Sequence, residues 1–128
     1  MNVDVIIPSK TNSTLAPIAR HCVESLRASE PADEVAWNVV VVETEWDTHP
    51  FHMGQDLTLF WPQDKPFNYN GALNLGIKAT RAEWVVLTNN DVIFHAGWFR
   101  EILRLHASDP SLARFRPCGM ICHLAIRD

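Results

Sequence analysis

A buried strand that ends in two amides and an acid most constrains how this chain can fold. Residues 83–94 read EWVVLTNNDVIF, in which an apolar run stops at Asn89, Asn90 and Asp91 and a second short apolar run follows. The run from Trp84 to Leu87 is apolar at successive positions, as expected for a strand that helices cover on both faces of a parallel sheet. Open α/β sheets bind ligands at the carboxyl ends of their strands, where this cluster lies. The side-chain oxygens of the cluster suit Mg²⁺ or Mn²⁺. The alternative interpretation is that Asn and Asp merely form a turn here, for local reasons, and bind no ligand.

The composition indicates one ordinary globular domain. The chain has 128 residues, 47% hydrophobic and 20% charged, which is enough for one core and too short for two. Its net charge of −4 argues against a nucleic-acid-binding surface. No apolar run has the length of a membrane span, and the opening MNVDVIIPSK reads as a strand rather than a signal peptide. The odd number of cysteines, three, fits free thiols in a reducing compartment. We therefore expect a cytoplasmic protein that does not bind nucleic acid.

A possible structural metal site near the end of the chain is the weaker of two interpretations. Cys118, Cys122 and His123 lie close together, but the spacing lacks a second pair of zinc ligands. Packing of the thiols in the core is the favoured interpretation.

Strand-like and helix-like segments alternate along the chain. Strands are expected at residues 3–7, 37–42, 57–61, 84–87 and 120–126, and helices at 15–28, within 66–83 and from about 96, with a turn-rich connector at 108–116. The alternation predicts an α/β three-layer sandwich, Rossmann-like, with a mostly parallel sheet and right-handed crossovers. Residues 1–128 contain no repeat and no linker, so they are expected to form a single domain.

Each expected helix carries an apolar stripe. The residues expected on these buried faces are Ile18, Cys22, Val23 and Leu26, then Ala72, Leu73 and Ile77, and finally Trp98, Ile102, Leu103 and Leu105.

Polar groups follow three of the expected strands, in residues 9–12, 43–45 and 89–91. If the first, second and fourth strands are neighbours, these groups form one pocket. There, Glu43 can accept an N–H from a base edge, and Lys10 can offset phosphate charge. The alternatives are a solvated loop for Glu43 and a surface position for Lys10. No GxGxxG or GxxxxGK[ST] motif is present, so phosphate binding is expected to centre on a metal.

Several stretches together resemble glycosyltransferase family 2, the inverting enzymes of GT-A fold. They are VDVIIPSKTNS, VVVVETEWD, FNYNGALNLGIKATRAEWVVLTNNDVIFHAGWFREI and DPSLARFRPCGMICHL. The match keeps the family's motif order over almost the whole chain, and Asn-Asn-Asp-Val is similar to the variant of rhamnosyltransferase-like members. The resemblance implies binding of a nucleotide-diphosphate sugar with Mn²⁺ or Mg²⁺ and glycosyl transfer to an acceptor.

Site residues follow from the resemblance and from the strand-end argument together. The nucleotide-binding candidates are Pro8, Ser9, Lys10, Glu43, Asn74 and Asn90, and the metal-binding candidates are Asp91 and Asn89. The chain departs from the family pattern where Asn89 replaces an acid and where Leu73 stands at a position that is often Arg. Since an amide is a weaker ligand than a carboxylate, metal binding is expected to depend on the diphosphate of the donor.

The family's general base is expected in an acceptor-binding half that would follow Asp128, so the chain reads as truncated before that half. His95, four residues after Asp91, is the one candidate base to test, and a packing role is the stronger alternative. Two further functions stay open: a non-catalytic module that binds a nucleotide sugar, and an assembly subunit. We also expect a homo-oligomer, with Trp98, Phe99 and Phe115 as candidate contacts. The base and sugar of the donor, and the acceptor, are not determined.

Overall fold

The computed structural model describes residues 1–12, 14–45, 56–111, 114–115 and 122–126. Its elements are β1 (Asn2–Ser9), α1 (Ala16–Ala28), β2 (Ala36–Glu43), β3 (Leu57–Phe60), α2 (Tyr69–Lys78), β4 (Trp84–Thr88), α3 (Trp98–Ser108), β5 (Arg114–Phe115) and β6 (Cys122–Ile126). Cys118, and the side chains of Phe115, Cys122 and His123, lie outside what the structure describes.

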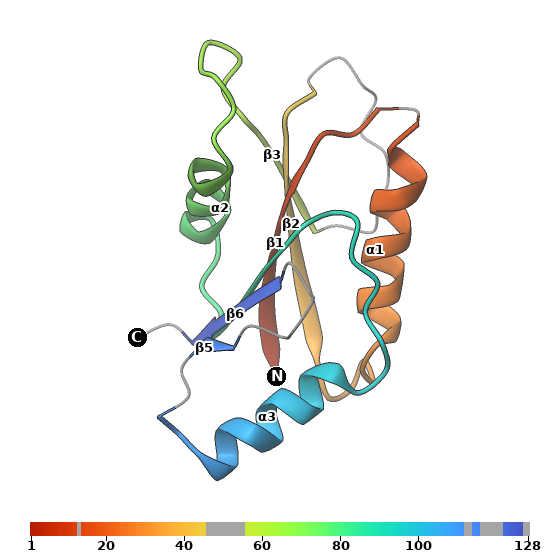
Figure 1. Cartoon of the computed structure of the whole chain (residues 1–128), viewed down its shortest axis with the longest axis vertical. Helices are drawn as coiled ribbons and strands as arrows, with labels where there is room; N and C mark the ends of the chain where they lie inside the picture. The colour runs from red at the N-terminus through yellow and green to blue at the C-terminus, as the bar shows by residue number, and fades with distance from the viewer. Residues whose placement is uncertain (13, 46–55, 112–113, 116–121, 127–128) are drawn as a thin grey trace.

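The sheet confirms the predicted α/β fold. Its strand order is β3-β2-β1-β4-β6-β5, and the first four strands run parallel (Figure 1). β6 runs antiparallel to β4 and also pairs antiparallel with β5, which lies in the stretch expected to be a connector. The central position of β1, between β2 and β4, is what brings the carboxyl ends of these three strands together.

Helices cover both faces of the sheet, as a sandwich of three layers requires (Figure 1). On one face α1 and α3 pack over alternate residues of the central strands. This core consists mainly of Val3, Val5, Ile7, Cys22, Val23, Leu26, Val39, Val41, Val86, Phe99 and Ile102. On the other face α2 covers a smaller core of Ile6, Val40, Val42, Ala72, Leu73 and Val85. The strands are thus apolar at successive positions because both faces are buried.

Two residues of the predicted helix stripes are exposed instead of buried. Ile18 is 49% exposed because it lies in the first turns of α1, where it lines a hollow beside Ile93 instead of packing on the sheet. Leu105 is 39% exposed because α3 contacts the core through Phe99 and Ile102, nearer its amino end.

The start of α3 is held by residues that follow α1. Gly97 precedes the helix with φ of +79°, a left-handed conformation that glycine adopts readily. The buried carboxylate of Glu30 accepts the backbone N–H groups of Phe99 at 2.9 Å and Arg100 at 3.1 Å, and so caps the helix. Trp98 donates through Nε1 to Ser29 Oγ at 2.9 Å.

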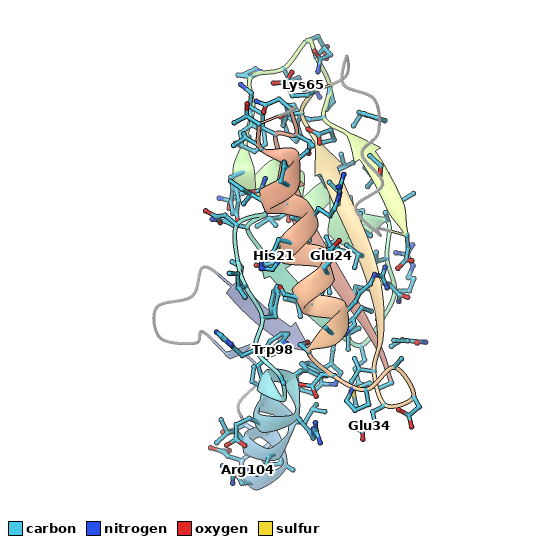
Figure 2. The ribbon with its side chains drawn as sticks, turned by 90° about the vertical axis from the view of Figure 1, so that its right-hand side faces the viewer. His21, Glu24, Glu34, Lys65, Trp98 and Arg104 are labelled. Atoms are coloured by element: carbon cyan, nitrogen blue, oxygen red, sulfur yellow. The ribbon has the colours of Figure 1, made fainter. Side chains whose placement is uncertain are left out.

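These contacts place α3 at the amino end of the sheet, away from the carboxyl ends of the central strands (Figures 1 and 2). The expectation that Phe99 is an oligomer contact is therefore wrong, because Phe99 is fully buried in the core. Trp98 stacks on Trp37 with ring centroids 5.9 Å apart and packs against the same core. No helix in the described part of the chain combines the length and the apolar character that crossing a membrane requires.

Candidate functional site

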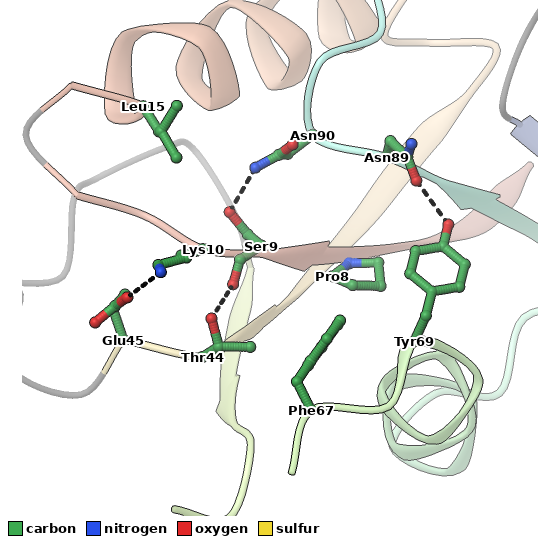
Figure 3. Close-up of a pocket in the computed structure, with 10 residues that line it drawn as sticks. All are labelled: Pro8, Ser9, Lys10, Leu15, Thr44, Glu45, Phe67, Tyr69, Asn89 and Asn90. Atoms are coloured by element: carbon green, nitrogen blue, oxygen red, sulfur yellow. Dashed lines mark hydrogen bonds and ion pairs between the residues drawn. The ribbon is translucent and has the colours of Figure 1, made fainter.

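The carboxyl ends of β1, β2 and β4 meet at one edge of the sheet. Ser9 and Glu43 are register partners in β1 and β2, and β4 pairs with the other side of β1. A cavity of about 560 Å³ opens at this edge (Figure 3). Its lining residues are Pro8, Ser9, Lys10, Leu15, Thr44, Glu45, Phe67, Tyr69, Asn89 and Asn90. Residues from all three polar segments thus lie together at this edge, as expected for neighbouring first, second and fourth strands.

A hydrogen-bond network through Ser9 joins the three strand ends. Asn90 donates from Nδ2 to Ser9 Oγ at 3.0 Å, and Ser9 Oγ lies 2.9 Å from Thr11 Oγ1. From the β2 side, Thr44 donates through Oγ1 to the backbone oxygen of Ser9 at 3.2 Å. Because Ser9 and Thr11 are buried, these bonds fix the floor of the cavity before a ligand arrives.

Glu43 shapes the site without lining the cavity. The residue is only 6% exposed, and its Oε1 accepts three backbone N–H groups, from Thr11 at 2.9 Å, Thr44 at 2.9 Å and Glu45 at 3.0 Å. A carboxylate that accepts several backbone N–H groups holds them in a fixed arrangement. In this structure Glu43 joins the loop after β1 to the loop after β2.

The rim of the cavity carries one ion pair. Lys10 Nζ lies 3.4 Å from Glu45 Oε1, and the Lys10 side chain is 66% exposed. An exposed pair of this kind contributes little to stability, so Lys10 is free to reorient toward an anionic ligand at small cost.

An aromatic wall lies opposite the strand ends and was not identified from the sequence. Phe67 and Tyr69 are 52% and 38% exposed, and both line the cavity from the segment that starts α2 (Figure 3). That segment is positioned by Asn68, whose side chain caps α2 by accepting the Gly71 N–H at 2.8 Å. Tyr69 donates through its hydroxyl to Asn89 Oδ1 at 2.8 Å. In the sequence, this wall is indicated by the two aromatic residues that flank the N-cap residue Asn68 in FNYN.

Asp91 lies on the same turn as Asn89 but lines a different hollow. This second hollow has a volume of about 340 Å³ and is lined by Pro17, Ile18, His21, Cys22, Asp91, Val92 and Ile93. Burial, and to a smaller extent the charge of Asp91, raise the pKa of the Cys22 thiol to about 11, although a hydrogen bond with the Val92 backbone lowers it. The thiol donates weakly to the backbone oxygen of Asn89 at 3.6 Å, which ties the turn to α1.

Two other predicted site residues do not line the cavity. Asn74 is exposed on α2, and His95 is exposed in the segment before α3.

The donors at this edge fit a divalent metal only in part. Within the described ranges no group of three or more His, Cys, Asp and Glu side chains can hold an ion. Asn89 lines the cavity, whereas the exposed Asp91 lines the second hollow, so the two oxygen donors of this turn do not face one space. Mg²⁺ is commonly held by one or two carboxylates together with phosphates and water, so an ion here would take most of its ligands from a bound diphosphate and water.

Comparisons with known proteins identify the fold. No protein-family model matches the chain, and no curated protein matches its sequence. A mannosyltransferase from Pyrobaculum calidifontis, solved with GDP-Man and Mn²⁺, superposes with a TM-score of 0.70 at 21% identity, over 98% of this chain and 44% of that one. S. aureus TarS (residues 1–349), solved with UDP-GlcNAc, superposes with a TM-score of 0.63 at 16% identity, over 84% of this chain and 32% of that one.

These structures define the class of fold. The chain shares the GT-A-like α/β fold of glycosyltransferase structures. It spans less than half of the length of each of these two chains.

Proposed function

We propose that this chain binds a nucleoside-diphosphate sugar at the carboxyl edge of its sheet, as the donor-binding part of an inverting, family 2-like glycosyltransferase. The observation that carries the proposal is the convergence of three strand ends on one cavity of about 560 Å³. The size is adequate for a nucleotide ligand. Support also comes from the fold shared with glycosyltransferases that were solved with GDP-Man and UDP-GlcNAc.

In this proposal the residues around the cavity have distinct roles. Pro8, Phe67 and Tyr69 provide apolar and aromatic contact for the nucleoside, and Lys10 offsets phosphate charge after leaving Glu45. Ser9 and Asn90 hold the floor and supply hydrogen bonds. Glu43 and Asn74 do not line the cavity, so Glu43 acts through the loops that it holds, and Asn74 supports binding from α2.

A divalent ion, Mn²⁺ or Mg²⁺, is part of the proposal. When bound, the ion stabilises negative charge on the departing diphosphate. Asp91 is its main protein ligand in this assignment and Asn89 the second. Because the protein offers few donors, metal and nucleotide are expected to bind together rather than separately.

A binding module without transferase activity is the second candidate. Glu45 is the one carboxylate among the cavity-lining residues, and it is paired with Lys10. His95, the candidate base, does not line the cavity. A general base must reach the acceptor hydroxyl within hydrogen-bond distance, and none of the described cavity residues is an evident choice. The acceptor and the sugar, rhamnose or another hexose, are left open by both candidates.

Calorimetric titration of UDP, GDP, dTDP and their sugars, each with and without Mn²⁺, tests the proposal. We expect one base to bind, with higher affinity when Mn²⁺ is present. Lys10→Met should weaken binding several-fold, whereas Lys78→Met, which removes an equal charge from the exposed end of α2, should not. Absence of binding by every nucleotide would contradict the proposal, and transfer or hydrolysis assays on the best ligand then separate the two candidates.

We also propose that the chain self-associates through the exposed apolar side chains of β3. β3 is the outermost of the described strands on that side of the sheet, and its Leu57 and Phe60 are 39% and 43% exposed. Burial of these two side chains against a second copy would favour association.

A further inference from the structure

Glu45 is the carboxylate that faces the cavity from the loop after β2. Its side chain is 34% exposed and lines the cavity, whereas Glu43 is buried and its Oε1 already accepts three backbone N–H groups. One of those N–H groups belongs to Glu45, at 3.0 Å. The neighbouring carbonyl of Thr44 accepts from Gln63 Nε2 at 3.2 Å. A ligand at this end of the cavity therefore meets a carboxylate on a stretch of backbone that hydrogen bonds hold in place.

The position of Glu45 within the cavity suits contact with the edge of a base. In Figure 3 Glu45 stands at one end of the lining and Asn89 at the other, with Pro8 and Phe67 between them. Phe67 is 52% exposed, so a base can stack on its ring. Stacking does not distinguish the bases, because every base has a π-face. Selection among them must come from the polar group that the edge of the base meets.

A carboxylate at this place distinguishes the bases by their N–H groups. It accepts hydrogen bonds and donates none, and its two oxygens accept two parallel N–H groups together. Guanine is the one common base whose Watson–Crick edge presents two adjacent donors, N1–H and the N2 amino group. Uracil and thymine present N3–H between two carbonyl oxygens, and adenine and cytosine present an amino group beside a ring nitrogen that is an acceptor. In these four bases an acceptor would stand against one of the carboxylate oxygens.

We propose that Glu45 selects guanine, so that the donor is a guanosine-diphosphate sugar. The inference rests on the proposed nucleotide function, in which Lys10 leaves Glu45 for the phosphates. The Glu45 carboxylate, whose Oε1 is 3.4 Å from Lys10 Nζ, then exchanges this ion pair for the two N–H groups of guanine. A base that offers one donor leaves the second oxygen facing an acceptor inside the covered cavity, and this cost produces the selectivity.

Calorimetric titration of the unmodified chain with GDP, IDP, UDP, dTDP and ADP, each in the same Mn²⁺ buffer, measures the selectivity. We expect GDP to bind at least about tenfold more tightly than UDP, dTDP and ADP. IDP differs from GDP only by the missing N2 amino group. It should bind about tenfold more weakly than GDP, the effect of one hydrogen bond to a charged group.

Glu45→Gln tests whether this side chain is responsible. The amide has one acceptor oxygen, and its NH₂ group would face an N–H of guanine, so the preference for GDP over IDP and over UDP should fall to within about threefold. The variant also loses a negative charge near the phosphates, which changes the affinity of every diphosphate alike, so the ratios of affinities carry the test. Glu24→Gln, at an exposed acid on α1, is the matched control and should keep the ratios of the unmodified chain.

Each outcome separates this inference from the proposed function. Binding of UDP, dTDP or ADP as tight as that of GDP overturns the guanine assignment and leaves the proposed function standing. A preference for GDP that persists in Glu45→Gln, or that falls equally in Glu24→Gln, overturns the role of Glu45. Absence of binding by all five diphosphates overturns both proposals. Circular dichroism of the two variants checks that the fold is retained, and the comparison of GDP with IDP needs no variant.

Discussion

The Oε1 atom of Glu43 lies 2.9 Å from the backbone nitrogen of Thr11, so the end of β2 holds the loop that follows β1. The same oxygen accepts the N–H groups of Thr44 and Glu45. One buried carboxylate thus fixes two of the three segments that form the floor of the cavity. Glu43 therefore has a structural role at the end of β2, whether or not it also contacts the base of a bound nucleotide.

Replacement of Glu43 should lower stability more than its position at the rim of the sheet suggests. Glu43→Ala leaves three backbone N–H groups without their acceptor, so we expect a loss of about 2–3 kcal/mol in the free energy of unfolding. Glu43→Gln keeps one oxygen acceptor and should lose less than half of that. Urea denaturation measures both, and Glu45→Ala is the control, with an expected change below about 1 kcal/mol because its ion pair with Lys10 is exposed. Equal losses for Glu43→Ala and Glu45→Ala would contradict this account.

Gly76 lets α2 lie directly on β1. A Cβ atom at Gly76 would stand 2.3 Å from Ile6 Cγ2, which is too close for any real contact. We therefore expect Gly76→Ala to destabilise the protein by about 1–3 kcal/mol, since overpacking forces the helix or the strand to shift. In a double-mutant cycle with Ile6→Ala, which removes the clashing atom, the two losses should be less than additive. If the losses in stability from Gly76→Ala and Ile6→Ala were strictly additive in thermal and urea unfolding, the added methyl group would not be in contact with Ile6.

The fold and the edge of the candidate site were predictable from sequence, for physical reasons. Strands buried on both faces give the uninterrupted apolar runs of 39–42 and 84–87, and turn residues after them mark the carboxyl edge. The aromatic wall was not predictable, because Phe67 and Tyr69 reach the cavity only through the tertiary placement of α2 on β1. The burial of Phe99 follows from the cap that Glu30 gives α3, which is a contact between residues far apart in the chain.

Cys22 should behave as an unreactive thiol in the folded protein. Burial is the main reason that its pKa is raised from an ordinary value of 9.0 to about 11. Because the pKa is higher in the folded state than in the unfolded state, the protonated thiol favours the folded state. This contribution to stability is fully present below pH 9 and is lost as the pH rises toward 11. In a variant that carries both Cys118→Ser and Cys122→Ser, Cys22 is the one thiol left. We expect Ellman's reagent at pH 8 to label it at least about tenfold more slowly in the folded protein than in protein unfolded by urea. Equally fast labelling in both would contradict the burial of this thiol.

Asp91 should govern metal-dependent binding without affecting the fold. The residue is exposed on the turn after β4, so Asp91→Ala should change the free energy of unfolding by less than about 0.5 kcal/mol. We expect the variant to lose the increase in nucleotide affinity that Mn²⁺ gives, while binding without metal is retained. Glu101→Ala, which removes another exposed acid, on α3, is the matched control. Calorimetry that shows the same Mn²⁺ effect in Asp91→Ala and in the unmodified chain would count decisively against the assignment.

Self-association through β3 gives the last prediction. A second copy packed against β3 would bury Leu57 and Phe60 at about 25 cal/mol per Å² of apolar area. We expect light scattering to show a dimer or a larger assembly at tens of micromolar. Phe60→Lys should shift it to monomer, because a charged side chain is costly to bury in an apolar contact. Ile18→Lys, at an equally exposed apolar residue on α1, should leave the assembly unchanged. A strict monomer at this concentration refutes self-association, and an assembly that resists Phe60→Lys but dissociates with Ile18→Lys would place the interface on α1 instead.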